Sequence, residues 1–251
     1  MIDKIIIALQ FLTIIKIESG KTQLREEDLA DSMIHFPLIG LLIGAMLVLE
    51  NFILLYLFPR AVVDIILIIS LIYLTGALHL DGLGDCFDAF YAGSDKEHIL
   101  TIMKDSHLGS MGVISLICLL GLKWACLSCM IPAIKNKALL CMPVLGRWAM
   151  VFITALSPYA RDTGKLGKIF ADYVNRNHLM KASLIPIVLS IGLFRIWGAL
   201  LILLIIALCV CVIKYLKYKL GGITGDTLGA SNEVMEVISL LFIVAGQRFK
   251  N

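Results

Sequence analysis

The chain has 251 residues, of which 59% are hydrophobic, a net charge of +3 and a mean hydropathy of +0.92. Soluble domains are roughly 45–50% apolar, so this composition favours a membrane protein over a soluble one. The positive charge is small and dispersed, and no basic stripe or interleaved aromatic motif accompanies it, which excludes a nucleic-acid-binding protein. No basic segment with a short apolar core and a small-residue cleavage site opens the chain, so we expect no removable signal peptide.

The apolar segments, taken in chain order, predict a short helix followed by a series of membrane spans. Residues 1–17 are too short for a span and predict an interfacial or re-entrant helix. A helix needs about 20 apolar residues to cross the hydrocarbon core, and the shorter runs reach this length only with flanking residues. We therefore predict an all-α, polytopic membrane helix bundle of about seven spans, with residues 1–251 forming one domain. The candidate spans lie at about 34–58, 62–80, 111–131, 138–157, 182–194, 197–213 and 233–246.

Long polar loops and short turns alternate between these spans, which places the two kinds of connection on opposite sides of the membrane. Cytoplasmic loops carry the excess of Lys and Arg. Of the 22 Lys and Arg residues, 14 lie in residues 1–33 and the long loops, and six lie in the short turns and the C-terminus. We therefore expect a multi-pass protein of the cell (plasma) membrane whose active site faces the cytoplasm. The long loops are predicted at 81–110, 158–181 and 214–232, and the short turns around Arg60, Lys135 and Arg195.

A dense polar motif follows the second predicted span, where residues 79–88 hold one His and three Asp. Asp81, Asp85 and Asp88 are spaced by four and three, so a helix would carry all three carboxylates on one face. A divalent cation would relieve their repulsion, and such oxygen ligands favour Mg²⁺ or Mn²⁺ over Zn²⁺, as is typical of phosphate chemistry. The other interpretation is a solvated acidic face at the membrane exit. The adjacent His79 is either a catalytic or an interfacial histidine.

Basic residues elsewhere offer contacts for an anionic substrate. Lys104, which precedes Asp105 in the segment 102–109, is suited to bind phosphate as a point charge or to anchor the loop at the membrane surface. Arg147 lies within a predicted span, where an uncompensated guanidinium requires a carboxylate or a phosphate as its partner. Lys123 also falls inside an apolar run, and there it faces a polar cavity or extends to the surface.

The third predicted loop is rich in small residues, which we expect to break the helix before the last span. Thr224 and Asp226 are favoured N-cap types, so one interpretation is a structural helix cap. Glu233 and Glu236 are three residues apart, on one helical face at the start of a span. They indicate ligands for a second cation or for a polar substrate.

Together, these motifs resemble the cobalamin synthase family, the adenosylcobinamide-GDP ribazoletransferases, over essentially the full chain. The sequence departs from the family pattern at Cys86, Phe87 and Ala89, where the family more often has small residues and Gly, but all three Asp residues are intact. The matching segments are Phe11-Leu12-Thr13, His35-Phe36-Pro37-Leu38-Ile39-Gly40, residues 79–88, residues 103–112, Arg147 and residues 221–236.

The resemblance implies a transferase that uses Mg²⁺. In the implied reaction, a hydroxyl of alpha-ribazole, or of its 5′-phosphate, attacks the cobinamide-linked phosphorus of adenosylcobinamide-GDP and releases GMP. Splitting a diphosphate by in-line attack needs positioning, a divalent metal and cations more than a protein nucleophile. The implied partners are these substrates and the lipid bilayer, and a homo-oligomer is left open. The expected roles are metal binding for Asp81, Asp85 and Asp88, general-base catalysis for His79, phosphate binding for Lys104 and Arg147, and substrate contacts for Asp105, Asp226, Glu233 and Glu236, the last three with a second metal as the alternative.

Two other functions stay open from the residues alone. A cation transporter also holds carboxylates near helix breaks, but it would place them near the bilayer midplane, and no inverted repeat is visible here. A phospholipid-type phosphotransferase that uses a nucleotide-diphosphate alcohol shares the acid-rich metal chemistry. The signature of those enzymes has an Ala-Arg after Asp-Gly and a later Asp-x-x-x-Asp. In this chain, Asp81-Gly82 is not followed by that Arg, and the Asp residues are more closely spaced than in the signature.

Overall fold

The structure, a computed structural model, describes residues 2–17, 25–105, 107–161 and 166–248. Every regular element in these ranges is a helix, which confirms the all-α prediction, and one isolated parallel β-bridge joins Tyr159 to Ile223. The helices are α1 (Ile2–Leu12), α2 (Glu26–Ser32), the 3₁₀ helix η1 (Met33–His35), α3 (Phe36–Leu54), α4 (Arg60–Thr75), α5 (Leu78–Ala92), α6 (Lys96–Ile102), α7 (Ser110–Cys129), α8 (Pro132–Ala155), α9 (Leu166–Tyr173), α10 (Arg176–Ala182), α11 (Leu184–Phe194), α12 (Ile196–Leu220) and α13 (Gly225–Arg248).

Among the described residues, six helices or helix runs are long and apolar enough to cross a membrane, and a bent pair would raise the number to seven. This confirms the prediction of about seven spans. The bent pair consists of α4 and α5, which meet at 91°. Gly76 (φ +59°) and Ala77 (φ +56°) both adopt the left-handed backbone conformation that ends α4 and redirects the chain. The six spans are Glu26–Leu54, α7, α8, Arg176–Phe194, α12 and α13.

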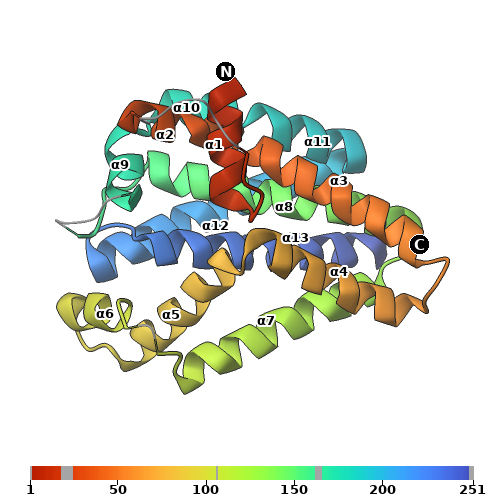
Figure 1. Ribbon diagram of the computed structural model, residues 1–251, viewed down its shortest axis with the longest axis horizontal. Coiled ribbons are helices and arrows are strands. Elements are labelled where there is room, and N and C mark those ends of the chain that lie inside the picture. Colours follow the sequence, from red (N-terminus) through yellow and green to blue (C-terminus); the bar gives the residue numbers. More distant parts are fainter. Residues whose placement is uncertain (1, 18–24, 106, 162–165, 249–251) are drawn as a thin grey trace.

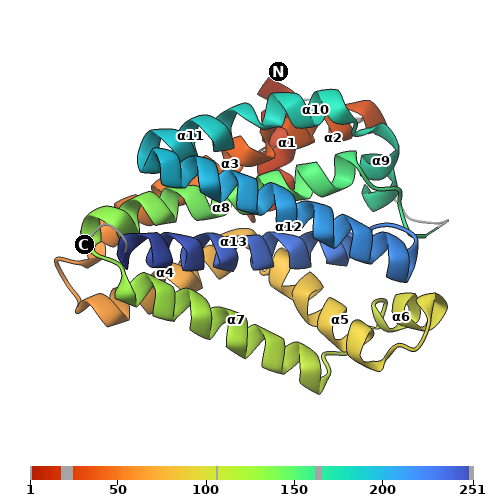
Figure 2. The same cartoon turned by 180° about the vertical axis from the view of Figure 1, so that it is seen from behind.

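Helix α8 forms the centre of the bundle. Every residue from Cys141 to Thr154 is buried, so this part of the helix is covered on all sides rather than along one stripe. It packs against α3 and α13, and Figure 2 shows α13 in turn lying between α7 and α12. Charged side chains on these facing surfaces are therefore remote from water and need partners within the protein.

Glycines bring α3 and α8 into close contact. A Cβ at Gly40 would lie 2.5 Å from the Pro143 carbonyl oxygen, and one at Gly44 would lie 2.7 Å from the Leu139 carbonyl oxygen. The two glycines form a Gly-x-x-x-Gly motif, the spacing that lets membrane helices approach backbone to backbone. Pro143 lies inside α8 and has no N–H to donate to the Leu139 carbonyl. Because backbone atoms of α8 lie where side chains at Gly40 and Gly44 would be, the contact depends on these two glycines of α3.

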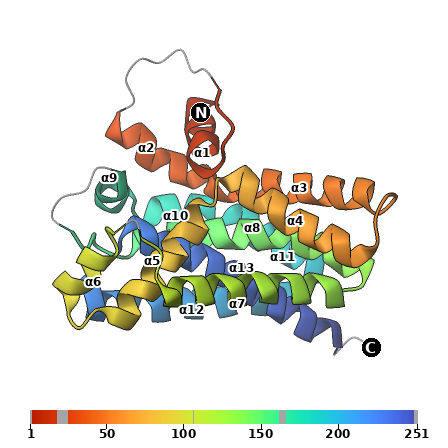
Figure 3. The same cartoon turned by 60° about the horizontal axis from the view of Figure 1, so that its bottom comes forward.

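The connections separate to the two ends of the bundle (Figure 1). At one end lie α6, α9 and the segment before α13, and at the other lie the turns after α3, α7 and α11 together with the end of α13. This arrangement agrees with the predicted alternation of long and short connections. Helix α1 has eleven residues and runs across the direction that α3, α8 and α13 share (Figure 3), as expected for an interfacial helix.

Among the described residues, all three predicted long loops are largely helical, and the segment 158–181 contains α9 and most of α10. The segment 81–110 contains most of α5 and all of α6, and α13 begins at Gly225 rather than near residue 233. The small residues that predicted a helix break instead permit α5 and α13 to pack closely. A Cβ at Gly82 would lie 2.8 Å from the Asp226 carbonyl oxygen, and one at Gly229 would lie 3.2 Å from the His79 Cα. The expected break within residues 221–236 is therefore wrong beyond Gly225.

A buried ion pair links the helices at the end with the short turns. The Lys135 ammonium on α8 binds the Asp64 carboxylate on α4, and Ser128 Oγ on α7 donates to Asp64 Oδ2 at 3.0 Å. Lys135 was expected in a short turn between two spans, but it lies inside α8 and is 1% exposed. Helix α8 thus begins earlier than its hydropathy predicts, and the ion pair with Asp64 neutralises the ammonium that this places in the interior.

Replacement of Gly44 by Leu should separate α3 from α8. Backbone atoms of α8 occupy the space that a side chain would need, and overpacking of a core costs about 1–3 kcal/mol. At about 2–4 °C per kcal/mol, Gly44→Leu should lower the melting temperature of the detergent-purified protein by several degrees. The matched control is Gly121→Leu on the exposed face of α7, where nothing lies within 4 Å of an added Cβ. Equal melting temperatures for the two variants would contradict this packing.

Candidate functional site

A cavity of about 220 Å³ lies where α5 packs against the start of α13. Its polar lining comes from His79 and Asp81 on α5 and from Asp226 on α13. Most of its apolar lining comes from η1 and helices α1, α3, α8 and α9. The cavity therefore brings together three of the predicted site residues from two distant segments of the chain.

The three aspartates of α5 have different surroundings. Asp81 is exposed and borders the cavity, and Asp85 lies one helical turn further along and is half-buried. Asp88 accepts backbone N–H groups from Gly109 at 2.7 Å and from Gly112 at 2.9 Å. These are free donors at the start of α7, so Asp88 caps that helix. The shared helical face is as predicted, but the structure gives Asp88 a structural partner.

Asp226 stands beside an arginine at the start of α13. Arg161 Nη2 lies 3.6 Å from Asp226 Oδ2, and both side chains are partly exposed. The segments that carry them are joined by backbone hydrogen bonds between residues 158–160 and Ile223. Thr224 caps the helix, since its Oγ1 accepts the Thr227 N–H at 3.2 Å. The capping interpretation of this segment therefore holds for Thr224, whereas Asp226 remains directed to the cavity and Arg161.

His79 is buried at the bend between α4 and α5. Its side chain borders the cavity, and the residue is 2% exposed. Within the described parts of the chain, neither ring nitrogen has a hydrogen-bond partner. A buried polar group without a partner is costly and calls for an explanation. A ligand in the cavity is the explanation that the position of the ring suggests.

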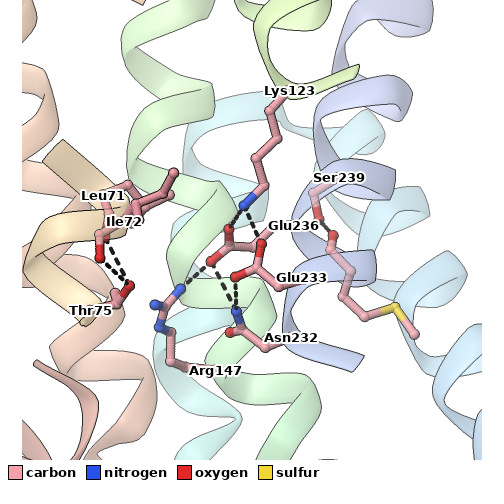
Figure 4. Close-up of polar contacts among 10 residues, drawn as sticks. Leu71, Ile72, Thr75, Lys123, Arg147, Asn232, Glu233, Glu236 and Ser239 are labelled. Carbon is pink, nitrogen blue, oxygen red and sulfur yellow. Dashed lines mark hydrogen bonds and ion pairs between the residues drawn. The ribbon is translucent and has the colours of Figure 1, made fainter. Parts of the chain in front are cut away.

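A network of buried charges occupies the interior of the bundle (Figure 4). Lys123 Nζ on α7 donates to Glu233 Oε2 at 2.7 Å and to Glu236 Oε2 at 2.6 Å, both on α13. Arg147 on α8 binds Glu236 through its Nη1. Asn232 Nδ2 donates to Glu233 Oε1 at 3.2 Å. Two cations thus face two carboxylates, and all four side chains are at least 93% buried.

Three residues that were predicted to bind substrate or metal instead have protein partners in this network. Arg147 was expected to bind phosphate, and Glu233 and Glu236 to bind substrate or a second metal. In the structure their charges are balanced by partners within the protein, and we therefore propose a structural role for all three. Lys123 was absent from the predicted site, although its position inside an apolar run was a signal that it needs a buried partner.

Lys104 and Asp105 lie on the exposed loop after α6 and are not among the residues that line the cavity. Asp105 Oδ1 contacts His107 Nδ1 at 2.5 Å. This hydrogen bond raises the pKa of His107 and lowers the pKa of Asp105 from their ordinary values. Both residues are fully exposed, so the pair fixes the local shape of the loop and adds little stability. The neighbouring Ser106 lies outside the described residues.

The carboxylates near the cavity suit a Mg²⁺ ion that is shared with a substrate. In the part of the chain that is described, no three His, Cys, Asp or Glu side chains are grouped closely enough to form a metal site by themselves. Mg²⁺ is usually held by one or two carboxylates, and water and substrate phosphates complete its octahedron. Asp81 and Asp85 supply such oxygens one helical turn apart. The donor set therefore fits a Mg²⁺ ion that is bound together with a phosphate substrate, and not a metal enclosed by protein ligands.

Removal of one cation should show whether the buried network depends on charge balance. Lys123→Met leaves two buried carboxylates with one cation, and breaking a buried pair costs about 3–5 kcal/mol. We expect a fall in melting temperature of about 10 °C, at about 2–4 °C per kcal/mol. The double variant Lys123→Met/Glu233→Gln restores neutrality and should recover part of this loss. The control is Lys214→Met on the exposed surface of α12. A double variant that melts below Lys123→Met would refute charge balance as the cause.

Comparison with known proteins extends over nearly the whole chain. A family model described as cobalamin-5-phosphate synthase matches residues 4–244. The chain is 34% identical over 249 residues to the adenosylcobinamide-GDP ribazoletransferase of Clostridium acetobutylicum, with 98% of each chain covered. The protein of the same name in Acetivibrio thermocellus is 35% identical to this chain over 249 residues, with 99% of each chain covered. The one in Geotalea daltonii is 39% identical over 248 residues, with 97% of this chain and 98% of the relative covered.

No solved structure matches the chain. The matched region includes both segments that form the polar wall of the cavity, residues 79–81 on α5 and Asp226 on α13. It also includes the helices that carry the buried charge network. The extent of the family match and the identity to these relatives show that the chain belongs to the cobalamin-5-phosphate synthase family.

Proposed function

We propose that this protein is an adenosylcobinamide-GDP ribazoletransferase whose reaction takes place at the cavity between α5 and α13. The observation that carries the proposal is the meeting of His79, Asp81 and Asp226 at one cavity, within a chain whose relatives bear that name. The transferred group is adenosylcobinamide phosphate, the acceptor is a hydroxyl of alpha-ribazole or of its 5′-phosphate, and GMP is the leaving group.

The proposed reaction is a direct displacement at phosphorus. The acceptor oxygen forms a bond to the cobinamide-linked phosphorus while the bond to the bridging oxygen breaks, and GMP departs with that oxygen. His79 accepts the proton of the acceptor hydroxyl on one of its two ring nitrogens, neither of which has a hydrogen-bond partner among the described residues. Burial of the ring excludes water, which would otherwise compete as the nucleophile. Arg161 adds positive charge near Asp226 for the diphosphate.

Asp81 and Asp85 would hold Mg²⁺ through their carboxylates. Asp226 borders the same cavity as Asp81. When bound, Mg²⁺ neutralises charge on the diphosphate and on the departing GMP. Mn²⁺ prefers the same oxygen ligands and is an alternative. Asp88 keeps its structural role at the start of α7 in this proposal, because two backbone donors already occupy its oxygens.

The proposed location is the cell membrane, with the cavity on the cytoplasmic side. The long connections and the start of α13 lie at one end of the bundle (Figure 1), and the excess of Lys and Arg lies in those connections. The substrates are large and polar, so an opening toward the cytoplasm gives them access without crossing the bilayer.

GMP release tests the proposed function directly. Detergent-purified protein should release GMP from adenosylcobinamide-GDP only when alpha-ribazole, or its 5′-phosphate, and Mg²⁺ are both present, and a cobalamin product should form in equal amount. Folded, monodisperse protein that yields neither product would refute the transferase assignment. Ion flux into liposomes without any nucleotide would then favour the transporter alternative.

Asp85→Asn and Asp88→Asn should have different consequences although the two residues share one helical face. Asp85→Asn removes a metal ligand, so activity should fall and the Mg²⁺ concentration for half-maximal activity should rise. Asp88→Asn presents an amide to two backbone donors and should cost about 1–3 kcal/mol of stability, with an unchanged Mg²⁺ titration of the remaining activity. Metal titrations and melting curves measured side by side separate the two roles. A changed Mg²⁺ titration in Asp88→Asn together with lost stability in Asp85→Asn would contradict both assignments.

The base assignment predicts that His79→Ala lowers kcat and leaves the Mg²⁺ dependence of the remaining activity intact. Loss of a general base typically reduces the rate by about 10²–10⁴-fold. The measurement is steady-state GMP release across a range of Mg²⁺ concentrations, with size-exclusion chromatography as the check on folding. Near-normal turnover by His79→Ala would exclude His79 as the base.

A further inference from the structure

Three phenylalanine rings from three helices meet at the cavity that His79 borders. Phe11 of α1 stacks on Phe36 of α3 at a centroid distance of 5.6 Å and 18° between planes. Phe170 of α9 meets both rings edge-on, at 5.4 Å from Phe11 and 6.2 Å from Phe36. All three line the cavity. They form an aromatic wall distinct from the polar wall of His79, Asp81 and Asp226.

Membrane insertion alone does not explain this aromatic wall. Phe11 and Phe170 lie on short helices that are not among the candidate spans, yet both rings are directed to the cavity. The proposed displacement reaction uses neither Phe11 nor Phe36. Met33 and Met150 add to the apolar lining, together with Leu78 and Leu228. The wall offers flat, apolar surfaces and no side-chain hydrogen-bonding group.

We propose that this aromatic wall, Phe11, Phe36 and Phe170, binds the benzimidazole base of the acceptor alpha-ribazole. The inference rests on the function proposed above and assigns the cavity to one of the two substrates. The base lies against the rings, and its ribose extends to His79, Asp81 and Asp226, where the attacking hydroxyl loses its proton. Stacking on aromatic rings is a general way of binding flat bases.

Size favours the acceptor over the corrinoid. The cavity holds about 220 Å³, which is below the roughly 300–1,000 Å³ of pockets that enclose drug-sized ligands. A benzimidazole is a bicyclic ring of suitable size, whereas a corrin macrocycle is far too large. The corrinoid must therefore lie outside, with only its diphosphate reaching the polar wall.

Polarity favours the benzimidazole over guanine, the other base in the reaction. Guanine carries several hydrogen-bond donors and acceptors, and each would lose its water against Phe and Met side chains that cannot replace it. A benzimidazole joined to ribose retains one ring nitrogen as an acceptor and has no donor. The aromatic wall therefore discriminates against the nucleotide base and accepts the apolar one.

Steady-state GMP release with full-length, detergent-purified protein tests the assignment. Each substrate is varied while the other is saturating, for wild type, Phe11→Leu and Phe170→Leu. Loss of stacking should raise KM for alpha-ribazole about tenfold and leave KM for adenosylcobinamide-GDP within about twofold of wild type. The control is Phe52→Leu on α3, whose ring is 60% exposed and contacts Tyr56 rather than the cavity, and both KM values should stay unchanged.

A second measurement does not depend on the folding of any variant. Wild-type protein is assayed with an acceptor riboside that carries imidazole in place of benzimidazole, and its KM should exceed that for alpha-ribazole by a similar factor. Unchanged KM values for alpha-ribazole in both variants would overturn the inference, and so would a rise confined to adenosylcobinamide-GDP, which would place guanine on the rings. Absence of wild-type turnover would instead refute the proposed function itself.

Discussion

Two cations and two carboxylates lie in the apolar interior of the bundle, and each is held by a group of opposite sign on another helix. An isolated charge at the centre of a bilayer costs at least about 2.5–3.5 kcal/mol. Lys123, Arg147, Glu233 and Glu236 avoid this cost only when α7, α8 and α13 are correctly assembled. The network therefore selects one arrangement of three helices that hydrophobic packing alone would leave underdetermined, since lipid and protein interiors are similarly apolar.

The same helix, α13, connects this network to the cavity. Glu236 and Glu233 lie inside the bundle, and Asp226 lies near the first turn of the helix. Between them, Gly229 fits against the backbone at His79, and Gly82 of α5 fits against the backbone at Asp226. The polar wall of the cavity is thus attached to a rigid, deeply buried helix, whereas the aromatic wall comes partly from the short helices α1 and α9. We infer that α5 and α13 position the reacting groups and that the short helices select the acceptor.

Hydropathy predicted the membrane spans well because span length is set by the bilayer, and helical spacing placed Asp81 and Asp85 on one face. The sequence could not distinguish Asp88 from them, since the Gly109 and Gly112 donors that it caps become neighbours only through folding. Arg147 and Lys123 were recognisable as buried charges, but their partners lie about 90–110 residues away. Small residues such as Gly229, which predicted a helix break, lie inside α13 because they allow it to pack closely against α5. The spacing of Gly40 and Gly44 in the sequence could have predicted that α3 packs closely against another helix.

Asp81 and Asp85 on α5 form one acidic pair, Glu233 and Glu236 on α13 form another, and we propose that only the first pair binds metal. Anomalous diffraction at the manganese edge would locate the ion in crystals grown with Mn²⁺ and adenosylcobinamide-GDP but without the acceptor. We expect anomalous density beside the carboxylates of Asp81 and Asp85, close to the cavity. Density between Glu233 and Glu236 instead would show that the buried network binds metal, and it would contradict the view that these charges only hold the bundle together.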